Sequence, residues 1–392
     1  MSNQAIYGSK RRSFFIKLAV GGLSGLVLSA NAAIEQPQMD NAAYILMDYD
    51  TGTVLAQKNA SQPFPPASMT KMMTSYLIEQ RLLKGGLKEN EMVLMTPDAW
   101  CKGTSEESCM YVPVNQQVPV IDMLKGIIIQ SGNDAAKAMA EHIAGSEGAF
   151  ADLMNEEAKK IGMTNTHFVN ATGMPAEGHE SSPQDMAKLA QAIIKNSSKY
   201  YPLYRQKEFT YNGITQGNRN ALLFTDPTVD GLKTGHTDNA GYCLTASSKR
   251  GDMRLISVIM GSKSAQKRAD ESRELLNWGF GHFTTKVVAP AKQSFGKVAV
   301  NFGKNDSVNA VTAANLQVLL PKIQQDKITT KLELPSNVAA PLTAGQPIGK
   351  VYAMLDGKPV ASVPLIAETA VDQSGIFKRL WQHIVAFFTN LF

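Results

Sequence analysis

The stretch PASMTKMMT, residues 66–74, places a serine and a lysine three residues apart in a segment with helical periodicity. Pro66 disfavours helix before it, and apolar residues continue the pattern as far as Leu82. Residues three apart project from the same face of a helix, so Ser68 and Lys71 would lie side by side. We therefore expect a buried helix with a candidate nucleophile and a candidate base at its N-terminal end.

This spacing alone does not identify a catalytic pair. The chain has two further Ser-x-x-Lys pairs, Ser264 with Lys267 and Ser294 with Lys297. A single pair of this kind is most often a solvated turn. The rest of the chain must decide whether any of the three pairs carries chemistry.

Length and composition indicate an ordinary globular protein. The 392 residues, 44% of them hydrophobic and 19% charged, are enough for two domains. The net charge is +5, but residues 1–33 hold four lysines and arginines and no acid, which leaves +1 for the rest. Nucleic acid is therefore not expected as a partner.

The first 32 residues have the three parts of a secretory signal: a basic start, an apolar run at 18–28, and small residues at Ala30 and Ala32. We expect a signal peptide, 1–32, cleaved after Ala32. A retained anchor is the alternative, although the run is short and rich in glycine. Arg11-Arg12 resembles a twin-arginine signal, whereas the nearby lysines also fit the ordinary route, and both lead out of the cytoplasm.

Export makes the three cysteines informative, because disulfides persist in an oxidising compartment. Cys101 and Cys109 are eight residues apart across a polar stretch, and we predict that they are bonded. Cys243 lies in an apolar run, so we predict a buried free thiol.

Strand patterns at both ends of residues 33–285, with helical periodicity between them, predict an α+β domain with an antiparallel sheet assembled from distant segments. The expected strands are 42–47, 53–57, 228–234, 241–247 and 253–260. The expected helices are 68–84, 121–128, 135–143, 149–160, 182–194 and 264–278. Residues 96–114 read as irregular.

Residues 286–371 predict a small all-β domain, because short β-prone runs alternate with Gly, Pro and Asn-Asp or Asp-Gly turns. The expected strands are 298–302, 316–320, 328–334, 349–355 and 358–364. This domain has no histidine or cysteine, and we assign it a spacer or docking role.

Residues 374–392 predict an amphipathic helix, with aromatic and aliphatic residues on one face and basic residues opposite. We expect it to lie flat on the outer leaflet of an inner membrane, since it is too short and too polar to span one. A helix packed on its own domain is the alternative.

Three polar motifs interrupt apolar surroundings: Ser68-x-x-Lys71, Ser131-Gly132-Asn133 and Lys233-Thr234-Gly235. The first begins a helix, the second separates two helices, and the third ends one strand-like run just ahead of another. Each placement allows the side chains to meet in one cleft. The histidines are not at metal-ligand spacing and no nucleotide motif is present, so we expect neither a metal nor a cofactor.

The motif set resembles that of the penicillin-recognising serine enzymes. The Ser-Gly-Asn variant is similar to that of low-molecular-weight penicillin-binding proteins, the D-alanyl-D-alanine carboxypeptidases of the type-5 and type-6 group. Stretches at 67–74, 217–220, 229–238 and 253–257 also resemble that family. The resemblance implies a penicillin-binding/β-lactamase-like transpeptidase domain, a small all-β domain and a C-terminal amphipathic anchor.

The residues themselves indicate acyl transfer. Ser68 needs an adjacent base to become a nucleophile, and Lys71 can serve if burial and the Lys233 cation lower its pKa. We expect Ser131 to relay a proton between Lys71 and the leaving amine, and Asn133 to hold the substrate amide.

The third motif is expected to bind the end of the substrate. Lys233 and Thr234 would meet a terminal carboxylate, and Gly235 would let the substrate backbone lie along the strand edge. The resemblance places an oxyanion hole at the backbone N–H groups of Ser68 and His236.

Two arginines complete the candidate site by resemblance. Arg219 and Arg268 are carboxylate-binding candidates, and for both the alternative is an ordinary surface charge.

These assignments predict a periplasmic enzyme on the inner membrane that removes D-alanine from peptidoglycan pentapeptide stems and is acylated by β-lactams. A β-lactamase is the first competitor, but residues 133–233 lack the Glu-x-x-Leu-Asn run of its commonest class. An endopeptidase acting on cross-links stays open, because the bond is chemically similar. A non-catalytic peptidoglycan-binding protein is disfavoured by the three intact motifs.

Overall fold

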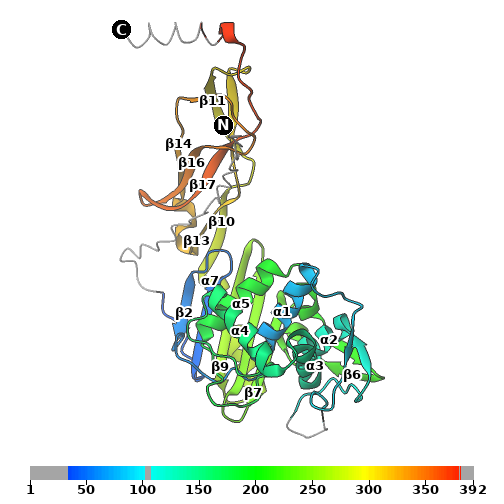
Figure 1. Ribbon diagram of the computed structural model, residues 1–392. Helices are drawn as coiled ribbons and strands as arrows, with labels where there is room; N and C mark the ends of the chain where they lie inside the picture. The colour runs from blue at the N-terminus through cyan, green and yellow to red at the C-terminus, as the bar shows by residue number, and fades with distance from the viewer. Residues whose placement is uncertain (1–33, 102–106, 379, 381–392) are drawn as a thin grey trace, which may run out of the picture. The chain divides into compact units, whose positions relative to one another are not determined.

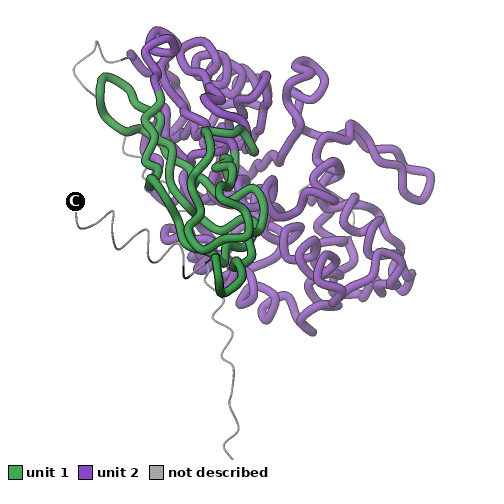
Figure 2. Tube along the Cα trace, turned by 90° about the horizontal axis from the view of Figure 1, so that it is seen from above, with its two compact units in different colours: residues 1–27, 292–314, 330–392 green, residues 28–291, 315–329 purple. Residues whose placement is uncertain are grey.

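The computed structural model describes residues 34–101, 107–378 and 380. The predicted signal peptide and the predicted amphipathic helix beyond residue 380 lie outside these residues. Two compact units are present (Figure 2). The larger unit contains the described residues up to 291 together with 315–329, and the smaller unit contains 292–314 and the described residues from 330 onward.

A five-stranded antiparallel sheet in the order β2-β1-β9-β8-β7 forms the centre of the larger unit (Figure 1). Its strands are β1 Ala43–Asp48, β2 Val54–Lys58, β7 Val229–Thr237, β8 Gly241–Arg250 and β9 Met253–Ser262. The strand β1 of the N-terminal hairpin therefore pairs with β9, some 200 residues later in the chain. The strand β7 is at one edge of the sheet.

Helices surround this sheet. They are α1 Lys71–Leu83, α2 Val120–Lys125, α3 Asn133–Ala144, α4 Glu147–Ile161, α5 Pro183–Asn196, α6 Leu222–Thr225 and α7 Ala265–His282. Shorter helical elements are the 3-10 turns Ala67–Thr70, Tyr201–Arg205 and Lys322–Lys327 and the π-helical turn Gly126–Gln130. Three two-stranded ribbons are also present: β3 Met92–Leu94 with β4 Gln117–Pro119, β5 Glu208–Tyr211 with β6 Ile214–Gly217, and β10 Phe283–Ala289 with β13 Leu316–Pro321.

Both faces of the sheet are covered, so the three inner strands β1, β9 and β8 are buried along most of their length. In β9, Leu255 and Ile259 pack with residues of α7, whereas Ile256 and Val258 pack with the helical cluster that includes α5. Alternate residues of a strand point to opposite faces, so β9 is hydrophobic on both.

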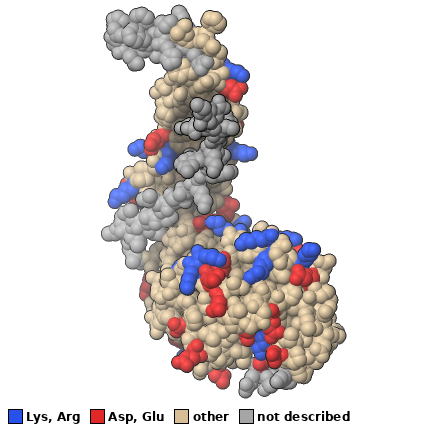
Figure 3. All heavy atoms as spheres, in the orientation of Figure 1, with Lys and Arg blue, Asp and Glu red and all other residues tan. Residues whose placement is uncertain are grey.

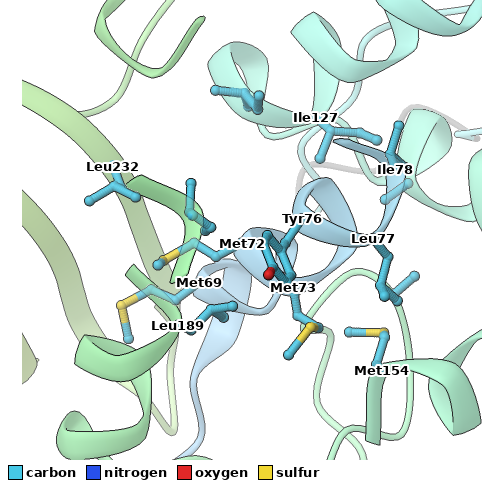
Figure 4. Packing of buried hydrophobic residues seen from close by; sticks show 14 of the residues in the cluster. Met69, Met72, Met73, Tyr76, Leu77, Ile78, Ile127, Met154, Leu189 and Leu232 are labelled. Atoms are coloured by element: carbon cyan, nitrogen blue, oxygen red, sulfur yellow. The ribbon is translucent and has the colours of Figure 1, made fainter. Parts of the chain in front are cut away.

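The helix α1 lies inside the larger core. Met69, Met72 and Met73 are fully buried, and Figure 4 shows them among side chains from several other elements, including Leu189 and Leu232. The flexible thioether side chain fills irregular space well. This packing surrounds the turn that carries Ser68.

The smaller unit is a six-stranded sheet in the order β14-β16-β17-β12-β11-β15. Its strands are β11 Ser294–Asn301, β12 Ser307–Thr312, β14 Thr329–Glu333, β15 Asn337–Ala339, β16 Pro347–Leu355 and β17 Lys358–Ala367. Adjacent strands with known register are antiparallel except β11 and β15. Among the described residues, no helix is both long and apolar enough to span a bilayer.

The predicted five sheet strands and six helices are confirmed, each within four residues at either end. The predicted Cys101–Cys109 disulfide and the buried free Cys243 are also confirmed. The predicted strand 316–320 exists, but it pairs with β10 in the larger unit. The hairpin β5–β6 was not predicted, although its turn, Asn212-Gly213, is a typical two-residue hairpin turn with positive φ at both positions.

Glu79 on α1 makes the stability of this core depend on pH. Its carboxyl group is fully buried, accepts a hydrogen bond from the Tyr204 hydroxyl at 2.8 Å, and has a pKa raised by burial from 4.5 to about 8. Its contribution to stability is complete below pH 4.5 and is lost as the pH rises through the folded-state pKa of about 8. In that window the free energy of unfolding should fall by up to about 1.4 kcal/mol per pH unit.

We expect Glu79→Gln to flatten this dependence in urea unfolding measured across the same pH window. The exposed Glu208→Gln is the matched control and should keep the wild-type slope. Equal slopes for the wild type and Glu79→Gln would contradict the assignment.

Candidate active site

Ser68 lies in a 3-10 turn, Ala67–Thr70, that leads directly into α1. The preceding residue, Ala67, has a positive φ of 48°, a conformation that costs energy for a residue with a side chain. Ser68 is only half-buried, whereas its neighbours on both sides are buried. The turn thus presents one hydroxyl at the boundary of a rigid core.

Lys71, the first residue of α1, is fully buried and contacts three oxygen atoms. Its Nζ lies 3.1 Å from Ser68 Oγ, 2.6 Å from Asn133 Oδ1 and 2.6 Å from the Thr172 carbonyl oxygen. Burial, assisted by the Arg219 cation, lowers the pKa of Lys71 to about 7. A substantial fraction of this amine is therefore neutral at physiological pH.

The second motif follows the π-helical turn Gly126–Gln130. Ser131 adopts a left-handed conformation with φ 63°, and Asn133 begins α3. Ser131 Oγ accepts a hydrogen bond of 2.9 Å from Lys233 Nζ. The structure brings Ser131 and Asn133 to the two lysines as expected, but Asn133, not Ser131, is the partner of Lys71.

The third motif lies on the edge strand β7, which packs against the Ser68 turn. Lys233 and Thr234 are buried, and the Lys233 ammonium also contacts its neighbour's carbonyl oxygen at 3.2 Å. Burial lowers the pKa of Lys233 well below its usual value, and the nearby Lys71 cation lowers it further. The repulsion between the two lysines therefore acts on the pKa of Lys233, whereas the pKa of Lys71 is lowered by burial and Arg219 and not, as the sequence predicted, by Lys233.

Gly235 has a role that the sequence did not predict. A Cβ atom at this position would lie 2.7 Å from the Pro66 carbonyl oxygen and 3.2 Å from the Met69 backbone nitrogen. The missing side chain therefore lets β7 approach the backbone around Ser68.

The remaining three candidates occupy different environments. His236 is exposed and stacks on Tyr242 with ring centroids 3.9 Å apart. Arg219 is also exposed, and its Nη1 donates to Ser108 Oγ at 2.6 Å. Arg268 is buried on α7, where its Nη1 lies 3.3 Å from the carbonyl oxygens of Gly235 and Cys243, and burial lowers its pKa to about 10.

The other two Ser-x-x-Lys pairs do not join this cluster. Ser264 is the N-cap of α7 and accepts a hydrogen bond from the Lys267 backbone nitrogen at 3.1 Å. Ser294 begins β11 in the smaller unit. Within the described part of the chain, no group of three or more His, Cys, Asp or Glu side chains could hold a metal ion.

The sequence did not indicate that Thr172 and Gly173 would lie against Lys71 and Ala67. Thr172 supplies a carbonyl oxygen to Lys71, and Gly173, with φ 83°, packs so closely on Ala67 that a Cβ would lie 1.9 Å from its carbonyl oxygen. Asn170 Oδ1 accepts the backbone N–H groups of both residues. The Asn-x-x-Gly pattern is a turn signal, but nothing in it indicates contact with Lys71.

His179 is a second missed neighbour. Its Nδ1 accepts from the Val169 backbone nitrogen at 2.9 Å, so its Nε2 carries the hydrogen and donates to Thr70 Oγ1 at 2.8 Å. Burial, with the nearby His167, lowers the pKa of His179 to about 4, which keeps the ring neutral.

Comparison with known proteins agrees with this geometry. Residues 30–264 match the family model described as D-alanyl-D-alanine carboxypeptidase, and residues 283–373 match the C-terminal domain of penicillin-binding protein 5. The chain is 41% identical to D-alanyl-D-alanine carboxypeptidase DacC of Escherichia coli, over 93% of this chain and 92% of that protein.

Solved structures give the same result. Penicillin-binding protein 5 from Haemophilus influenzae has a TM-score of 0.76 and 39% identity, covering 87% of this chain and 100% of its own. Penicillin-binding protein D2 from Listeria monocytogenes, solved with cefotaxime bound, has a TM-score of 0.58 and 27% identity, covering 63% and 99%. The predicted fold class, an α+β penicillin-binding-type domain followed by an all-β domain, is confirmed. This protein belongs to the serine-type D-alanyl-D-alanine carboxypeptidase family and carries the C-terminal domain of penicillin-binding protein 5.

Proposed function

We propose that Ser68 of this D-alanyl-D-alanine carboxypeptidase attacks the terminal D-Ala–D-Ala amide of peptidoglycan pentapeptide stems and forms an acyl-enzyme. The observation that carries this proposal is the 3.1 Å contact between Ser68 Oγ and a buried Lys71 amine with a pKa of about 7. Hydrolysis of the ester by water then releases the tetrapeptide.

Lys71 is the general base for acylation. A neutral amine has two N–H donors and one lone pair. The contacts of Lys71 match this set, because Asn133 Oδ1 and the Thr172 carbonyl oxygen accept the two donors. The lone pair is left for the Ser68 hydroxyl proton as its oxygen bonds to the substrate carbonyl carbon.

The second and third motifs complete the proton path. In this relay the Lys71 ammonium passes the proton that it took from Ser68 to Ser131 Oγ as Ser131 gives its own proton to the departing D-alanine amine, while Lys233 Nζ donates a hydrogen bond to the same oxygen. The backbone N–H groups of Ser68 and His236 form the oxyanion hole by family resemblance. Losing one such donor typically costs about 100- to 1,000-fold in rate.

The substrate lies along the outer edge of β7, which pairs with β8 on its inner edge. Its terminal carboxylate meets Thr234 and Lys233, with Arg219 at the exposed side. Arg268 is a positioning residue in this scheme, because its guanidinium ties the Gly235 and Cys243 carbonyl oxygens together beneath the cleft. Asn133 orients both Lys71 and the substrate amide.

β-Lactams are expected to acylate the same serine, since they imitate the terminal dipeptide and the related Listeria protein was solved with cefotaxime bound. Nucleic acid is not proposed as a partner. Acidic and basic side chains are intermingled on the face of the larger unit that Figure 3 shows.

We assign the chemistry to residues 33–285, a spacer or docking role to 286–371, and a periplasmic location at the inner membrane through 374–392. The start of the last segment supports this anchor. Ile376, Phe377 and Leu380 are 73%, 90% and 59% exposed, which leaves apolar side chains available to a membrane surface.

Ser68→Ala should abolish labelling by a fluorescent penicillin and release of D-alanine from a D-Ala-D-Ala pentapeptide, because no other hydroxyl is activated by Lys71. Ser294→Ala removes the serine of a pair with the same spacing in the smaller unit and should keep both activities. A wild-type protein that is folded but unlabelled would refute the acyl-enzyme. Rapid loss of the label with turnover of the drug would instead indicate a β-lactamase.

The rate constant for acylation should rise about tenfold per pH unit below pH 7 and level off above it, because Lys71 must lose its proton to act. Lys71→Arg keeps a cation that does not deprotonate, and should slow acylation by about 100- to 10,000-fold. The matched control is Lys267→Arg, which should retain the wild-type pH profile. A flat profile in the wild type would exclude Lys71 as the base.

A chain ending at Gln373 should lose binding to vesicles of anionic phospholipid in a flotation assay while keeping its penicillin label. The apolar side chains that reach the bilayer surface are removed, whereas the cleft is intact. If the shortened chain floats as well as the full chain, the helix is not the anchor.

A further inference from the structure

The Cys101–Cys109 disulfide lies beside the candidate active site. Both cysteines are buried, with exposed fractions of 5% and 2%, and their Cα atoms are 6.0 Å apart. The bond joins the segment that leaves β3 to the residue directly after Ser108. What Ser108 contacts therefore decides what the disulfide can hold in place.

Ser108 connects the second motif to Arg219. Its carbonyl oxygen accepts the Asn133 backbone N–H at 2.7 Å, and its hydroxyl oxygen accepts Arg219 Nη1 at 2.6 Å. The next carbonyl oxygen, that of Cys109, accepts Gln216 Nε2 at 2.9 Å. The carbonyl groups of Ser108 and Cys109 thus link α3 to β6, the strand that precedes Arg219.

The segments at both ends of the disulfide are attached to the same helix, α3. On one side, the Met110 and Val112 backbone nitrogens donate to the buried Asp134 carboxylate at 2.8 and 3.2 Å, in the first turn. On the other side, Thr96 Oγ1 donates to Glu141 Oε2 at 2.6 Å, in the last turn. The disulfide therefore joins two segments that each donate hydrogen bonds to α3.

We propose that the Cys101–Cys109 disulfide is a positioning element for substrate binding, which holds Ser108 so that its hydroxyl oxygen orients the Arg219 guanidinium toward the substrate carboxylate. This inference rests on the proposed function. A covalent link at Cys109 limits the conformations open to its neighbour Ser108. The hydrogen bond from Arg219 therefore does not have to fix the position of Ser108 by itself. Reduction to two thiols by an added dithiol removes this restraint and breaks no other bond.

Loss of the disulfide should weaken substrate binding more than it slows the catalytic step. Lys71 is held by Thr172 and by its place at the start of α1, and neither belongs to the disulfide segment. Its third support, Asn133, donates its backbone N–H to the Ser108 carbonyl oxygen, but Asn133 is also held as the first residue of α3. Arg219, in contrast, is exposed, and Ser108 Oγ accepts a hydrogen bond from its guanidinium. We therefore expect KM for a D-Ala-D-Ala peptide to rise about tenfold without the disulfide, as for the loss of one hydrogen bond to a charged group. The value of kcat should change less than about twofold.

The test compares steady-state release of D-alanine by the oxidised full chain, by the same chain treated with dithiothreitol, and by Cys101→Ser/Cys109→Ser. Thiol counting by mass spectrometry establishes the redox state. The double variant should show the raised KM with or without reductant, and reoxidation of the reduced wild type should restore the original KM. Cys243→Ala, which removes the buried free thiol, should respond to reductant as the wild type does.

Ser108→Ala in the oxidised protein should raise KM by a similar factor, because it removes the Arg219 contact directly. An unchanged KM in the double variant and in the fully reduced protein overturns the inference. The inference is also overturned if kcat, the circular dichroism signal of the folded protein and penicillin labelling all fall together, since the disulfide would then only stabilise the fold. Absence of D-alanine release and of penicillin label in the folded, oxidised wild type would refute the proposed function instead.

Discussion

The site depends on a lysine amine buried without a carboxylate partner. Lys71 Nζ is surrounded by a hydroxyl, an amide oxygen and a backbone carbonyl oxygen, all of them neutral. A carboxylate in contact would have stabilised the ammonium and raised its pKa. Burial among neutral acceptors does the opposite, so the helix α1 holds an amine with a lowered pKa beside the Ser68 hydroxyl.

Keeping such an amine buried requires several segments to meet closely, and glycine makes this possible. Gly235 lets the edge strand β7 lie against the backbone around Ser68, and Gly173 lets a turn pack on Ala67 from another side. Both contacts are tighter than any side chain would allow. The left-handed conformations of Ala67 and Ser131 in the same region fit the tendency of backbone strain to gather at functional sites.

Local pattern was a good guide to most elements of the larger unit. The predicted first hairpin, the buried helix after Ser68 and the long helix α7 are confirmed, because their periodicity follows from which face is buried. The ribbon β10–β13 was not predicted as a pair. The segment 284–290, where a domain boundary is predicted, ends next to residue 291, the last residue before the smaller unit begins, but it also forms the strand β10, which pairs with residues some 30 positions later in the chain. Pairing between distant strands has no local sequence signal. The hairpin β5–β6, in contrast, has one in its Asn212-Gly213 turn.

The sequence by itself determined the family, the three motifs, the order of the five central-sheet strands and six main helices, and the choice of Cys101 and Cys109 as a bonded pair. These follow from residue types at short spacing. Only the tertiary structure decided that Asn133 rather than Ser131 contacts Lys71, that Thr172 supplies its third oxygen, and that Ser108 links the disulfide to Arg219. Hydrogen bonds between residues 62 to 111 positions apart depend on how the segments pack, and a pattern along the chain does not specify which distant residues meet.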